Sequence, residues 1–562
     1  MHESRLTPQL PDTDVIIAGG GPAGLMLAIE LGRRGVAVAL FDDDRADSFS
    51  PQANATQART MEHFRRLGFA GEIRRLGLPA DYPTDIAYFT RYAGYELARF
   101  SLPSSGAARS RIQTLTGSWS AAELPHRVSQ MYVERVLQRH AAALPSVTLH
   151  YEHEVVAVRD DGARATATVE HGGKTFEASA RFLVGCDGPG SLVRKHLGVR
   201  YEGEAGVQRN FAGGRMHAVH LRSAAVRSAM SGPPGWMHVN VHHARRSFTI
   251  ALDGASEFVF HTQLLAGEDE AALTDSDVRR MFADCMGREI DFEILFRASW
   301  TAGFALVAER FRPGNSGGRL FLAGDAAHLF TPMGGLGYNT AVEDAVNLGW
   351  KLAAVVKGWG GPGLLDSYEL ERKPAAVRNT GYARAFADSL GNFIPDPKLE
   401  EASPEGEALR AEAGAYFEDH GRREFNIPGI TFGTRIDGSP AILPDGTAPP
   451  PDRPNEYVPT ACPGGRPPHA WLADGSSLYD RFGFEFTLLD LGRDPDRAAP
   501  MLEAARSAGL PLTHVAPGDP ALRDLYEADY ALIRPDQTVA WRGSDFGDAA
   551  GLVDVVRGAG GG

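Results

Sequence analysis

The 562-residue sequence contains few cysteines, no long apolar run and no surplus of positive charge. Its three cysteines, Cys186, Cys285 and Cys462, lie far apart and form no C-x-x-C pair. This excludes a disulfide framework and a zinc cluster, and it is typical of the reducing cytoplasm. A run of about eighteen apolar residues, which a membrane span requires, does not occur. The net charge of −14 argues against a nucleic-acid partner, because phosphate binding needs clustered Lys and Arg.

The chain is long enough for several domains. On a prior of about one domain per 150 residues, its length predicts two to four. An apolar fraction of 43% is ordinary for globular proteins and provides material for several cores. Residues 1–14 are polar and lack the apolar segment of a signal peptide, so we expect a cytoplasmic protein.

The strongest pattern lies near the N-terminus. It consists of an apolar strand, a glycine-rich turn, a helix, a second strand and an acidic residue, at residues 15–18, 19–24, 25–34, 36–41 and 42. In this G-x-G-x-x-G spacing, Gly19 permits the tight turn, Gly21 lets the backbone approach a pyrophosphate, and Gly24 lets helix and strand pack closely. The helix N-terminus adds unpaired N–H groups, and Asp42 is placed to accept hydrogen bonds from a ribose. The pattern predicts dinucleotide binding; the alternative is an empty Rossmann-like unit.

The middle and C-terminal parts of the chain show different periodicities. Alternating apolar residues predict an antiparallel sheet from 86–102, 237–242, 247–252, 258–264 and 292–300, with a helix at 274–285. Further strands are predicted at 147–158, 165–171, 180–186 and 319–325, and helices from 341 to about 387. Residues 393–462 are irregular apart from one helix near 404–422, and we expect them to form a connecting segment that packs on the surface. The last hundred residues predict a βαβ-like unit without a redox cysteine pair, which favours a structural or dimer-forming role over catalysis.

Two later motifs place acidic residues and glycines at the ends of predicted strands. Asp187 and Gly188 follow the strand at 180–186, and Gly324 and Asp325 end the strand at 319–325. In open α/β sheets the carboxyl ends of the strands contact the ligand, although Asp325 could also be a simple helix cap. A glycine loop at 332–339 follows, where the missing Cβ atoms let the backbone approach a flat ring. His328, between these features, is expected to be a packed helix histidine.

The three motifs in this order identify a resemblance. The chain resembles the single-component FAD-dependent aromatic hydroxylases, the group of the phenol hydroxylases and p-hydroxybenzoate hydroxylase. Within this group it is most similar to the chlorophenol and polyketide hydroxylases that carry a thioredoxin-like C-terminal domain. The resemblance covers essentially the whole chain after the first dozen residues.

The resemblance implies a multidomain fold of mixed α/β and α+β class. A Rossmann-type FAD domain (12–85, 120–200 and 310–390) is expected to contain an inserted antiparallel-sheet substrate domain (86–119 and 201–309). A connecting segment (391–462) then leads to a thioredoxin-like domain without redox cysteines (463–562). A homodimer is also implied.

The resemblance assigns FAD to a defined set of residues. The ADP half is expected to be bound by the first motif and its neighbours, Gly19, Gly21, Pro22, Ala23, Gly24 and Asp42. The ribityl chain is expected to contact Gln130 and Asp325, which lies beside Gly324. Asp187 and Gly188 are implicated in binding both FAD and NAD(P)H. The loop under the flavin comprises Pro332, Gly335, Leu336, Gly337 and Asn339, and the helix N-terminus that follows would stabilise the negative charge of reduced flavin. Many relatives have an arginine where this chain has Gln52, so Arg45 or Arg59 is expected to contact the pyrophosphate.

The implied reaction is a monooxygenation that uses NADPH or NADH as co-substrate. Reduced flavin takes up O₂ at C4a, and the resulting hydroperoxide hydroxylates an electron-rich ring of a small aromatic, phenolic or polyketide-type substrate. This species decays in water, so we expect the antiparallel insert to close a dry pocket. No metal is expected, and no second strand–G-x-G-x-x-G–helix unit predicts a nicotinamide domain. The alternatives are a flavin-dependent oxidase or oxidative decarboxylase on the same scaffold, and a non-catalytic flavoprotein.

The group that activates a phenol stays open at this point. Some phenol hydroxylases have an aspartate where this chain has Asn54, so a different base is needed. The candidates on the insert or the flavin loop are His217, His220, His238, His261 and Tyr338, and Pro332 is a further catalytic candidate beside the ring. The alternative for each histidine is a surface or structural role. Arg91 and Arg215 could steady a phenolate or carboxylate, or be exposed strand arginines.

Overall fold

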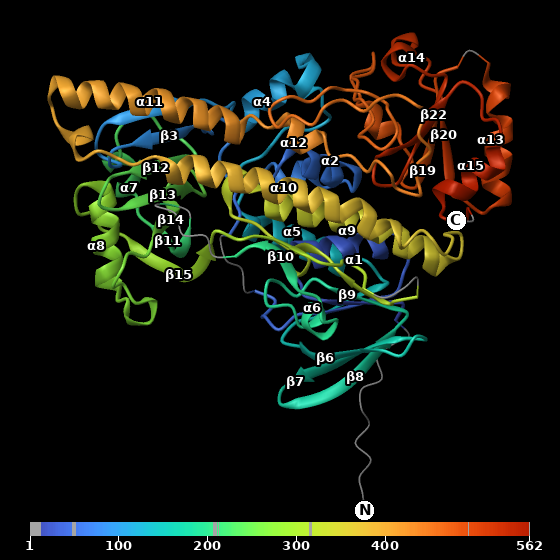
Figure 1. Ribbon diagram of the computed structural model, residues 1–562, viewed down its shortest axis with the longest axis horizontal. Helices are drawn as coiled ribbons and strands as arrows, with labels where there is room; N and C mark the ends of the chain where they lie inside the picture. Colours follow the sequence, from blue (N-terminus) through green and yellow to red (C-terminus); the bar gives the residue numbers. More distant parts are fainter. Residues whose placement is uncertain are drawn as a thin grey trace, which may run out of the picture.

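The computed structural model describes residues 13–47, 52–205, 211, 213–313, 317–492 and 494–560. An antiparallel sheet lies at the left of Figure 1, a parallel sheet in the centre and the C-terminal domain at the right. The long helices α9 (Leu336–Lys357) and α10 (Ser367–Asn392) run across the middle. Within the described ranges, no helix is both long and apolar enough to cross a membrane.

The central sheet is parallel, with strand order β17-β9-β1-β2-β5. Its strands are Leu320–Leu322, Phe182–Gly185, Val15–Ala18, Val38–Phe41 and Val147–His150, in that order. Every residue of β1, β2 and β9 is buried, because both faces of the sheet are covered. One face packs on α1 (Pro22–Gly32), and the other on the sheet of β6 (Glu154–Asp160), β7 (Ala165–His171) and β8 (Lys174–Ala180). This confirms the predicted Rossmann-type unit.

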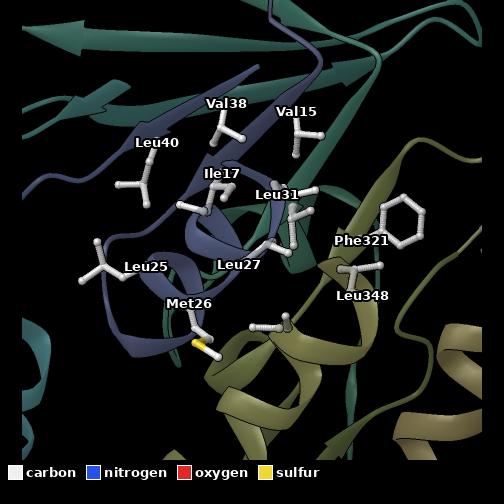
Figure 2. Packing of buried hydrophobic residues seen from close by; sticks show 14 of the residues in the cluster. Val15, Ile17, Leu25, Met26, Leu27, Leu31, Val38, Leu40, Phe321 and Leu348 are labelled. Atoms are coloured by element: carbon white, nitrogen blue, oxygen red, sulfur yellow. The ribbon is translucent and has the colours of Figure 1, made fainter. Parts of the chain in front are cut away.

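Helix α1 connects the parallel sheet to α9. Figure 2 shows Ile17 of β1 next to Leu27 and Leu31 of α1, with Leu348 of α9 on the far side. Burying one such side chain stabilises the fold by about 1.5–3 kcal/mol. Helix α5 (Gln130–Ala142) packs on the same helix α1. The N-termini of α1 and α9 are therefore held at fixed positions by one continuous core.

The second large sheet has seven strands in the order β15-β11-β14-β13-β12-β3-β4. They are Glu293–Ala302, Gly214–Arg222, Glu257–Gln263, Arg246–Ala251, Met237–Val241, Ile86–Phe89 and Glu96–Phe100. All neighbours are antiparallel except β12 and β3, which are parallel. The sheet thus joins the predicted hairpin to strands more than a hundred residues later, and we propose that 86–119 and 201–309 form one substrate-binding part.

Two helices cover this sheet. Helix α8 (Asp275–Met286) begins with a capping box of Thr274 and Asp277 and buries Phe282 against Phe260 of the sheet. Helix α11 (Pro404–Phe425) lies across β3 and β4, at the upper left of Figure 1. Tyr88 of β3 stacks on Phe417 of α11, with ring centroids 4.7 Å apart.

The C-terminal domain has a four-stranded sheet in the order β20-β19-β21-β22, with β19 and β20 parallel and the other pairs antiparallel. Its strands are Leu512–Val515, Phe486–Asp490, Tyr530–Ile533 and Val539–Gly543, and its helices are α13 (Ala499–Ser507), α14 (Pro520–Tyr526) and α15 (Ala549–Val556). The core of this domain continues into the FAD-type domain, because Trp350 of α9 packs edge-on against Phe486, with ring centroids 5.7 Å apart.

The structure corrects two local predictions and adds a sheet. The predicted strand at 147–158 is two strands in different sheets, β5 and β6, because Glu152 between them has a left-handed backbone with φ of 59°. His328 lies in the short strand β18 (His328–Leu329) and not in a helix. That strand belongs to a sheet with β10 (Tyr201–Glu204) and β16 (Ala305–Ala308), which the sequence did not predict.

Candidate active site

One cavity of about 1160 Å³ lies between the carboxyl ends of the parallel sheet and one face of the seven-stranded sheet. Sites for drug-sized ligands occupy about 300–1,000 Å³, so this cavity has room for more than a small ligand. One end is lined by acidic residues that include Asp42 and Asp44, and the other by aromatic residues that include Trp236 and Phe296. The cavity therefore has a polar end and an apolar end.

The polar end is built by the first glycine motif. Gly19 has φ of 105°, and a Cβ atom there would lie 2.2 Å from the carbonyl oxygen of Cys186. Gly21 begins α1 without a side-chain cap, and a Cβ atom at Gly21 would meet no protein atom within 4 Å. Gly24 does not line the cavity but packs against Gly19, as its predicted role requires. Asp42 accepts hydrogen bonds from the N–H groups of Gly20 and Asp44, while burial raises its pKa.

The second and third motifs meet the first at this end. Asp187 accepts a hydrogen bond from the N–H of Val193 through Oδ2, and its buried Oδ1 has no partner among the described residues. Gly188 has φ of 73° and open space where a Cβ would stand. Asp325 is exposed to the cavity although protein surrounds it, and burial raises the pKa of its carboxyl group. A Cβ on Gly324 would lie 3.0 Å from Ala23 of α1, so the third motif packs directly on the first.

Helix α9 points an uncapped N-terminus into the middle of the cavity. Gly334 and Gly335 have φ of 72° and 62°, and Gly335 supplies no side-chain cap. Leu336 and Gly337 of the first turn line the cavity. Their turn therefore presents unpaired N–H groups and the positive end of the helix dipole to whatever occupies the cavity.

Asn339 holds this turn from behind and does not itself line the cavity. Its amide nitrogen donates to the carbonyl oxygens of Ala55, at 2.9 Å, and Gly335, at 2.6 Å. Its oxygen accepts from Thr60 Oγ1 and from the N–H of Gln57. The structure thus places Asn339 as a positioning residue for the glycine turn.

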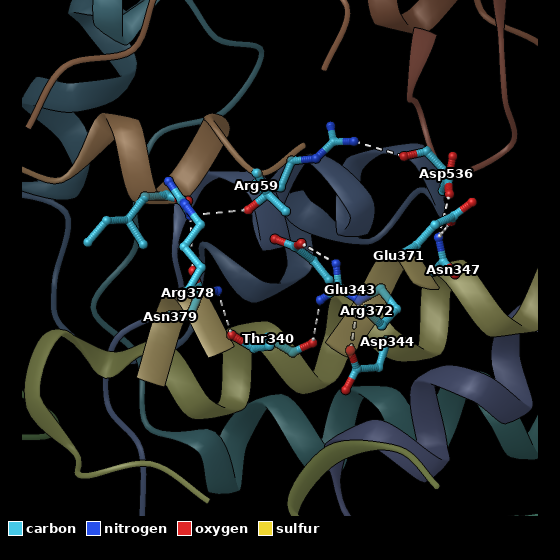
Figure 3. Close-up of polar contacts among 12 residues, drawn as sticks. Arg59, Thr340, Glu343, Asp344, Asn347, Glu371, Arg372, Arg378, Asn379 and Asp536 are labelled. Carbon is cyan, nitrogen blue, oxygen red and sulfur yellow. Dashed lines mark hydrogen bonds and ion pairs between the residues drawn. The ribbon is translucent and has the colours of Figure 1, made fainter. Parts of the chain in front are cut away.

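Asp344 of α9 anchors the loop that carries Asp325. It accepts hydrogen bonds from the N–H of Gly324, at 3.2 Å, and from His328 Nε2, at 2.6 Å. The Arg372 guanidinium of α10 donates to its other oxygen, at 2.8 Å, and Figure 3 shows this pair. Sequence patterns did not reveal Asp344, because it lies inside a helix and acts on a segment about twenty residues away.

These features fit FAD. Two uncapped helix N-termini, at Gly21 and Gly335, face one cavity, and a cofactor with a pyrophosphate and a flat ring needs both. The open space beside Gly21 and Gly188 gives backbone access to phosphate. Asp187 Oδ1, which has no partner among the described residues, and the open carboxylate of Asp325 could accept hydrogen bonds from ribose or ribityl hydroxyls. Asp42, Gln130, Pro22, Ala23 and Pro332 line the same cavity.

Arg59 is not where the cofactor prediction places it. Its guanidinium donates to the carbonyl oxygens of Asp536, at 2.8 Å, and Gln537, at 2.9 Å, and it does not line the cavity. Figure 3 shows Arg59 directed toward Asp536 of the C-terminal domain. Arg45, the other candidate, does line the cavity at its acidic end.

The structure separates the candidate catalytic residues into two groups. His220, His261, Tyr338 and Asn54 line the cavity, whereas His217 and His238 do not. His217 contacts Ser299 Oγ at 2.8 Å, and His238 stacks on Phe89. Burial lowers the pKa of His261 to about 3, so this imidazole is neutral at physiological pH. Arg91 and Arg215 lie outside the cavity and pair with Glu400 and Glu270.

Helix α11 contributes side chains that the sequence prediction missed. His420, Glu424 and Phe425 line the apolar end of the cavity. Glu424 Oε1 accepts a hydrogen bond from the N–H of Gly334 at 2.9 Å, so α11 also holds the glycine turn. The segment predicted as a surface connection therefore forms part of the site. The i, i+4 spacing of His420 and Glu424 was a signal for a polar helix face.

The carboxyl group of Glu134, at the polar end of the cavity, should make the stability of the fold depend on pH. Burial raises the pKa of Glu134 from 4.5 to about 7, opposed by a hydrogen bond from Gln130 and assisted by Asp42 and Asp44. Because the folded-state pKa is the higher one, protonated Glu134 stabilises the fold below pH 4.5, and this contribution is lost as the pH rises through about 7. Glu134→Gln stays neutral, so we expect it to be more stable than the wild type at pH 8, by up to about 3 kcal/mol. Melting temperatures of the two cofactor-free proteins at pH 5 and pH 8 test this; an equal difference at both pH values contradicts it.

Comparison with known proteins agrees with this site. A family model described as FAD binding domain matches residues 12–382, and one described as aromatic-ring hydroxylase, C-terminal, matches residues 460–561. The FAD-dependent monooxygenase apdD of Emericella nidulans is 30% identical over 96% of this chain and 88% of its own length.

Solved structures resemble the whole chain. The rebeccamycin biosynthetic enzyme RebC with reduced flavin is 31% identical with a TM-score of 0.86, covering 98% of this chain and 99% of that one. A ternary complex of aklavinone-11 hydroxylase with FAD and aklavinone is 26% identical with a TM-score of 0.80, covering 98% and 100%. The fold and the site thus define an FAD-dependent monooxygenase. Within that class, the chain belongs to the FAD-binding aromatic-ring hydroxylase family with the additional C-terminal domain. The family expected from the sequence is confirmed.

Proposed function

We propose that the protein hydroxylates an aromatic ring, with electrons from NAD(P)H and one oxygen atom from O₂. One observation carries the proposal: the uncapped N-terminus of α9 faces the same cavity as the apolar side of the seven-stranded sheet. A flat cofactor ring at Gly335 and an aromatic substrate would therefore lie next to each other. The homodimer expected from the resemblance stays a prediction.

The residues divide into holding and shielding roles. Bound FAD supplies the electron transfer and the activation of O₂. Asp42, Asp187 and Asp325 would hold its hydroxyl groups, and the first turn of α9 would stabilise negative charge at the edge of the ring. The apolar end would exclude water from the reacting atoms, and its lining includes Trp236, Val239, Phe248, Ile250, Val259 and Phe296.

His220 is the histidine that best fits the phenol-activating base. It lines the cavity, and its Nε2 lies 3.1 Å from Glu257 Oε2, which orients the ring as a catalytic base requires. His261 is less suited, because a group with a pKa of about 3 is a weak acceptor for a phenolic proton. Asn54, at the position of the family aspartate, lines the cavity but cannot act as a base.

Labelled oxygen tests the proposed reaction. We expect the FAD-loaded protein to oxidise NADPH or NADH faster in the presence of an accepted phenol, and to place one atom of ¹⁸O₂ in the product. Mass spectrometry of the product measures the label. An oxidised product without label would indicate an oxidase or oxidative decarboxylase on this scaffold. A flavin that no nicotinamide reduces, with any aromatic present, would indicate a non-catalytic flavoprotein.

A further inference from the structure

Arg127 is a buried cation for which the described residues supply no ion pair and no hydrogen-bond acceptor. It lies just before α5, lines the apolar end of the cavity and is only 8% exposed. Its guanidinium lies over the ring of Trp236, 4.2 Å from the centroid, and Trp236 packs edge-on against Phe425 of α11. Among the described residues, it forms no ion pair and donates no hydrogen bond from its side chain. A stacked guanidinium keeps its edge free, with up to five N–H donors.

Such a side chain is costly unless something pairs with it. Burial lowers the pKa of Arg127 to about 10, with Glu424 as the opposing charge, so the group stays protonated at neutral pH. One oxygen of Glu424 accepts the N–H of Gly334, and the other lies 2.9 Å from His420 Nε2, so no hydrogen bond or ion pair joins Glu424 to Arg127. Buried guanidinium groups are ordinarily paired with an anion or hydrogen-bonded to carbonyl oxygens. The described residues supply no acceptor, so the nitrogens of Arg127, which face the cavity, are free to donate to a group bound there.

We propose that Arg127, held flat by Trp236, binds an anionic oxygen group on the aromatic substrate, either a carboxylate or a phenolate. This inference rests on the proposed function and names the substrate class of that site. The guanidinium fork matches a planar carboxylate in two parallel hydrogen bonds, and a phenolate oxygen in one or two. A substrate bound in this way would have its apolar ring against the wall that includes Phe248 and Ile250. Arg127 is then a specificity-determining residue that selects ionised aromatic compounds.

Binding to the oxidised, FAD-loaded enzyme tests this inference without turnover. The probes are salicylate, 3-hydroxy-2-naphthoate, their methyl esters and 2-naphthol, with binding followed by the change in flavin absorbance. In Arg127→Met we expect the affinity for the carboxylates to fall about 10- to 100-fold, the loss of a hydrogen bond to a charged group. The affinity of Arg127→Met for the esters should differ from that of the wild type by less than about 3-fold. Arg127→Lys, which keeps the charge but not the fork, should lie between the wild type and Arg127→Met.

Thermal stability distinguishes binding from a structural role. Because the described residues form no ion pair or hydrogen bond with the Arg127 side chain, Arg127→Met should melt at the same temperature as the ligand-free wild type or higher. Arg246→Met is the matched control, since Arg246 is equally buried but donates to the carbonyl oxygens of Phe393, at 3.0 Å, and Leu390, at 2.9 Å. That variant should lose stability and keep its affinity for carboxylates within about 3-fold.

The outcomes separate this inference from the proposed function. A weaker affinity of Arg127→Met for 2-naphthol at alkaline pH, with carboxylates unaffected, identifies phenolate as the bound anion. Carboxylate and naphthol affinities that do not change in Arg127→Met overturn the inference, as does a wild type that binds none of these anions. An equal loss for acids and esters, together with a lower melting temperature, also overturns it. If no ¹⁸O enters a product but anion binding still depends on Arg127, the proposed reaction fails and the binding site stands.

Discussion

Gly21→Val is expected to give a folded protein that holds no FAD. A Cβ atom at Gly21 meets no protein atom within 4 Å and the backbone there is extended, with φ of −70°, so we expect the fold to accept a larger side chain. The space that it fills lies at the N-terminus of α1, where a pyrophosphate needs direct access to backbone N–H groups. We expect FAD affinity to fall by at least about 100-fold, because the displaced phosphates lose several charge-assisted hydrogen bonds of about 1.5–3 kcal/mol each. Flavin released per chain after heat denaturation measures occupancy, and circular dichroism measures folding.

Two other glycines serve as controls for this variant. Gly35→Ala changes a turn with φ of 68° and open space around it, so it should cost about 1 kcal/mol of stability and keep full FAD content. Gly24→Ala places a Cβ 2.0 Å from the carbonyl oxygen of Gly19, so this variant should lose stability as well as cofactor. A Gly21→Val protein that purifies yellow, with one FAD per chain, contradicts the proposed position of the pyrophosphate.

Glu371→Gln is expected to cost about 3–5 kcal/mol and to loosen the C-terminal domain, because it removes one partner of a buried charge cluster. Glu371 of α10 accepts from Lys351 Nζ at 2.6 Å, and from both terminal nitrogens of Arg534 at 2.8 Å. Burial alone would raise the pKa of Glu371, but Arg534 and Lys351 outweigh it and hold the pKa below its usual range. Asp536 pairs with Arg534 and also accepts a hydrogen bond from the side-chain amide of Asn347. The cluster therefore joins α9, α10 and the C-terminal domain, as Figure 3 shows in part.

Lys351→Met is the matched control for the cluster. It removes one buried charge but leaves Glu371 with its paired contacts to Arg534 and with Ser439 and Asn347 as donors. Burial already lowers the pKa of Lys351 to about 8, so the ammonium is held less firmly than the guanidinium. We expect this variant to lose no more than about 1–2 kcal/mol. Differential scanning calorimetry measures the loss of stability, and the rate of limited proteolysis within residues 461–562 measures loosening of the C-terminal domain. Equal losses in both variants would contradict a central role for Glu371 in the cluster.

Local patterns predicted the elements that bind the two ends of the cofactor. The turn at Gly19–Gly24, the acid at Asp42 and the glycines before α9 all appear in the structure with the expected backbone, because these features depend on angles and contacts within a few residues. The antiparallel strands between 237 and 264 were likewise visible as alternation. Which strand neighbours which was not visible, and the parallel pairing of β12 with β3 joins segments about 150 residues apart.

The sequence by itself determined a dinucleotide-binding unit, an antiparallel insert and a C-terminal domain, each marked by short-range periodicity or by glycines in a tight turn, and its resemblance to the aromatic hydroxylases implied that the dinucleotide is FAD. Only the tertiary structure decided that α11 lines the cavity, that Arg59 contacts the C-terminal domain, and that Arg127 is a buried cation at the apolar end of the cavity. These outcomes depend on which buried faces meet, and therefore on the summed packing of distant segments. The sequence does not show which partner a charged side chain has, because an ion pair, or a donor left without an acceptor, arises only when distant segments pack together.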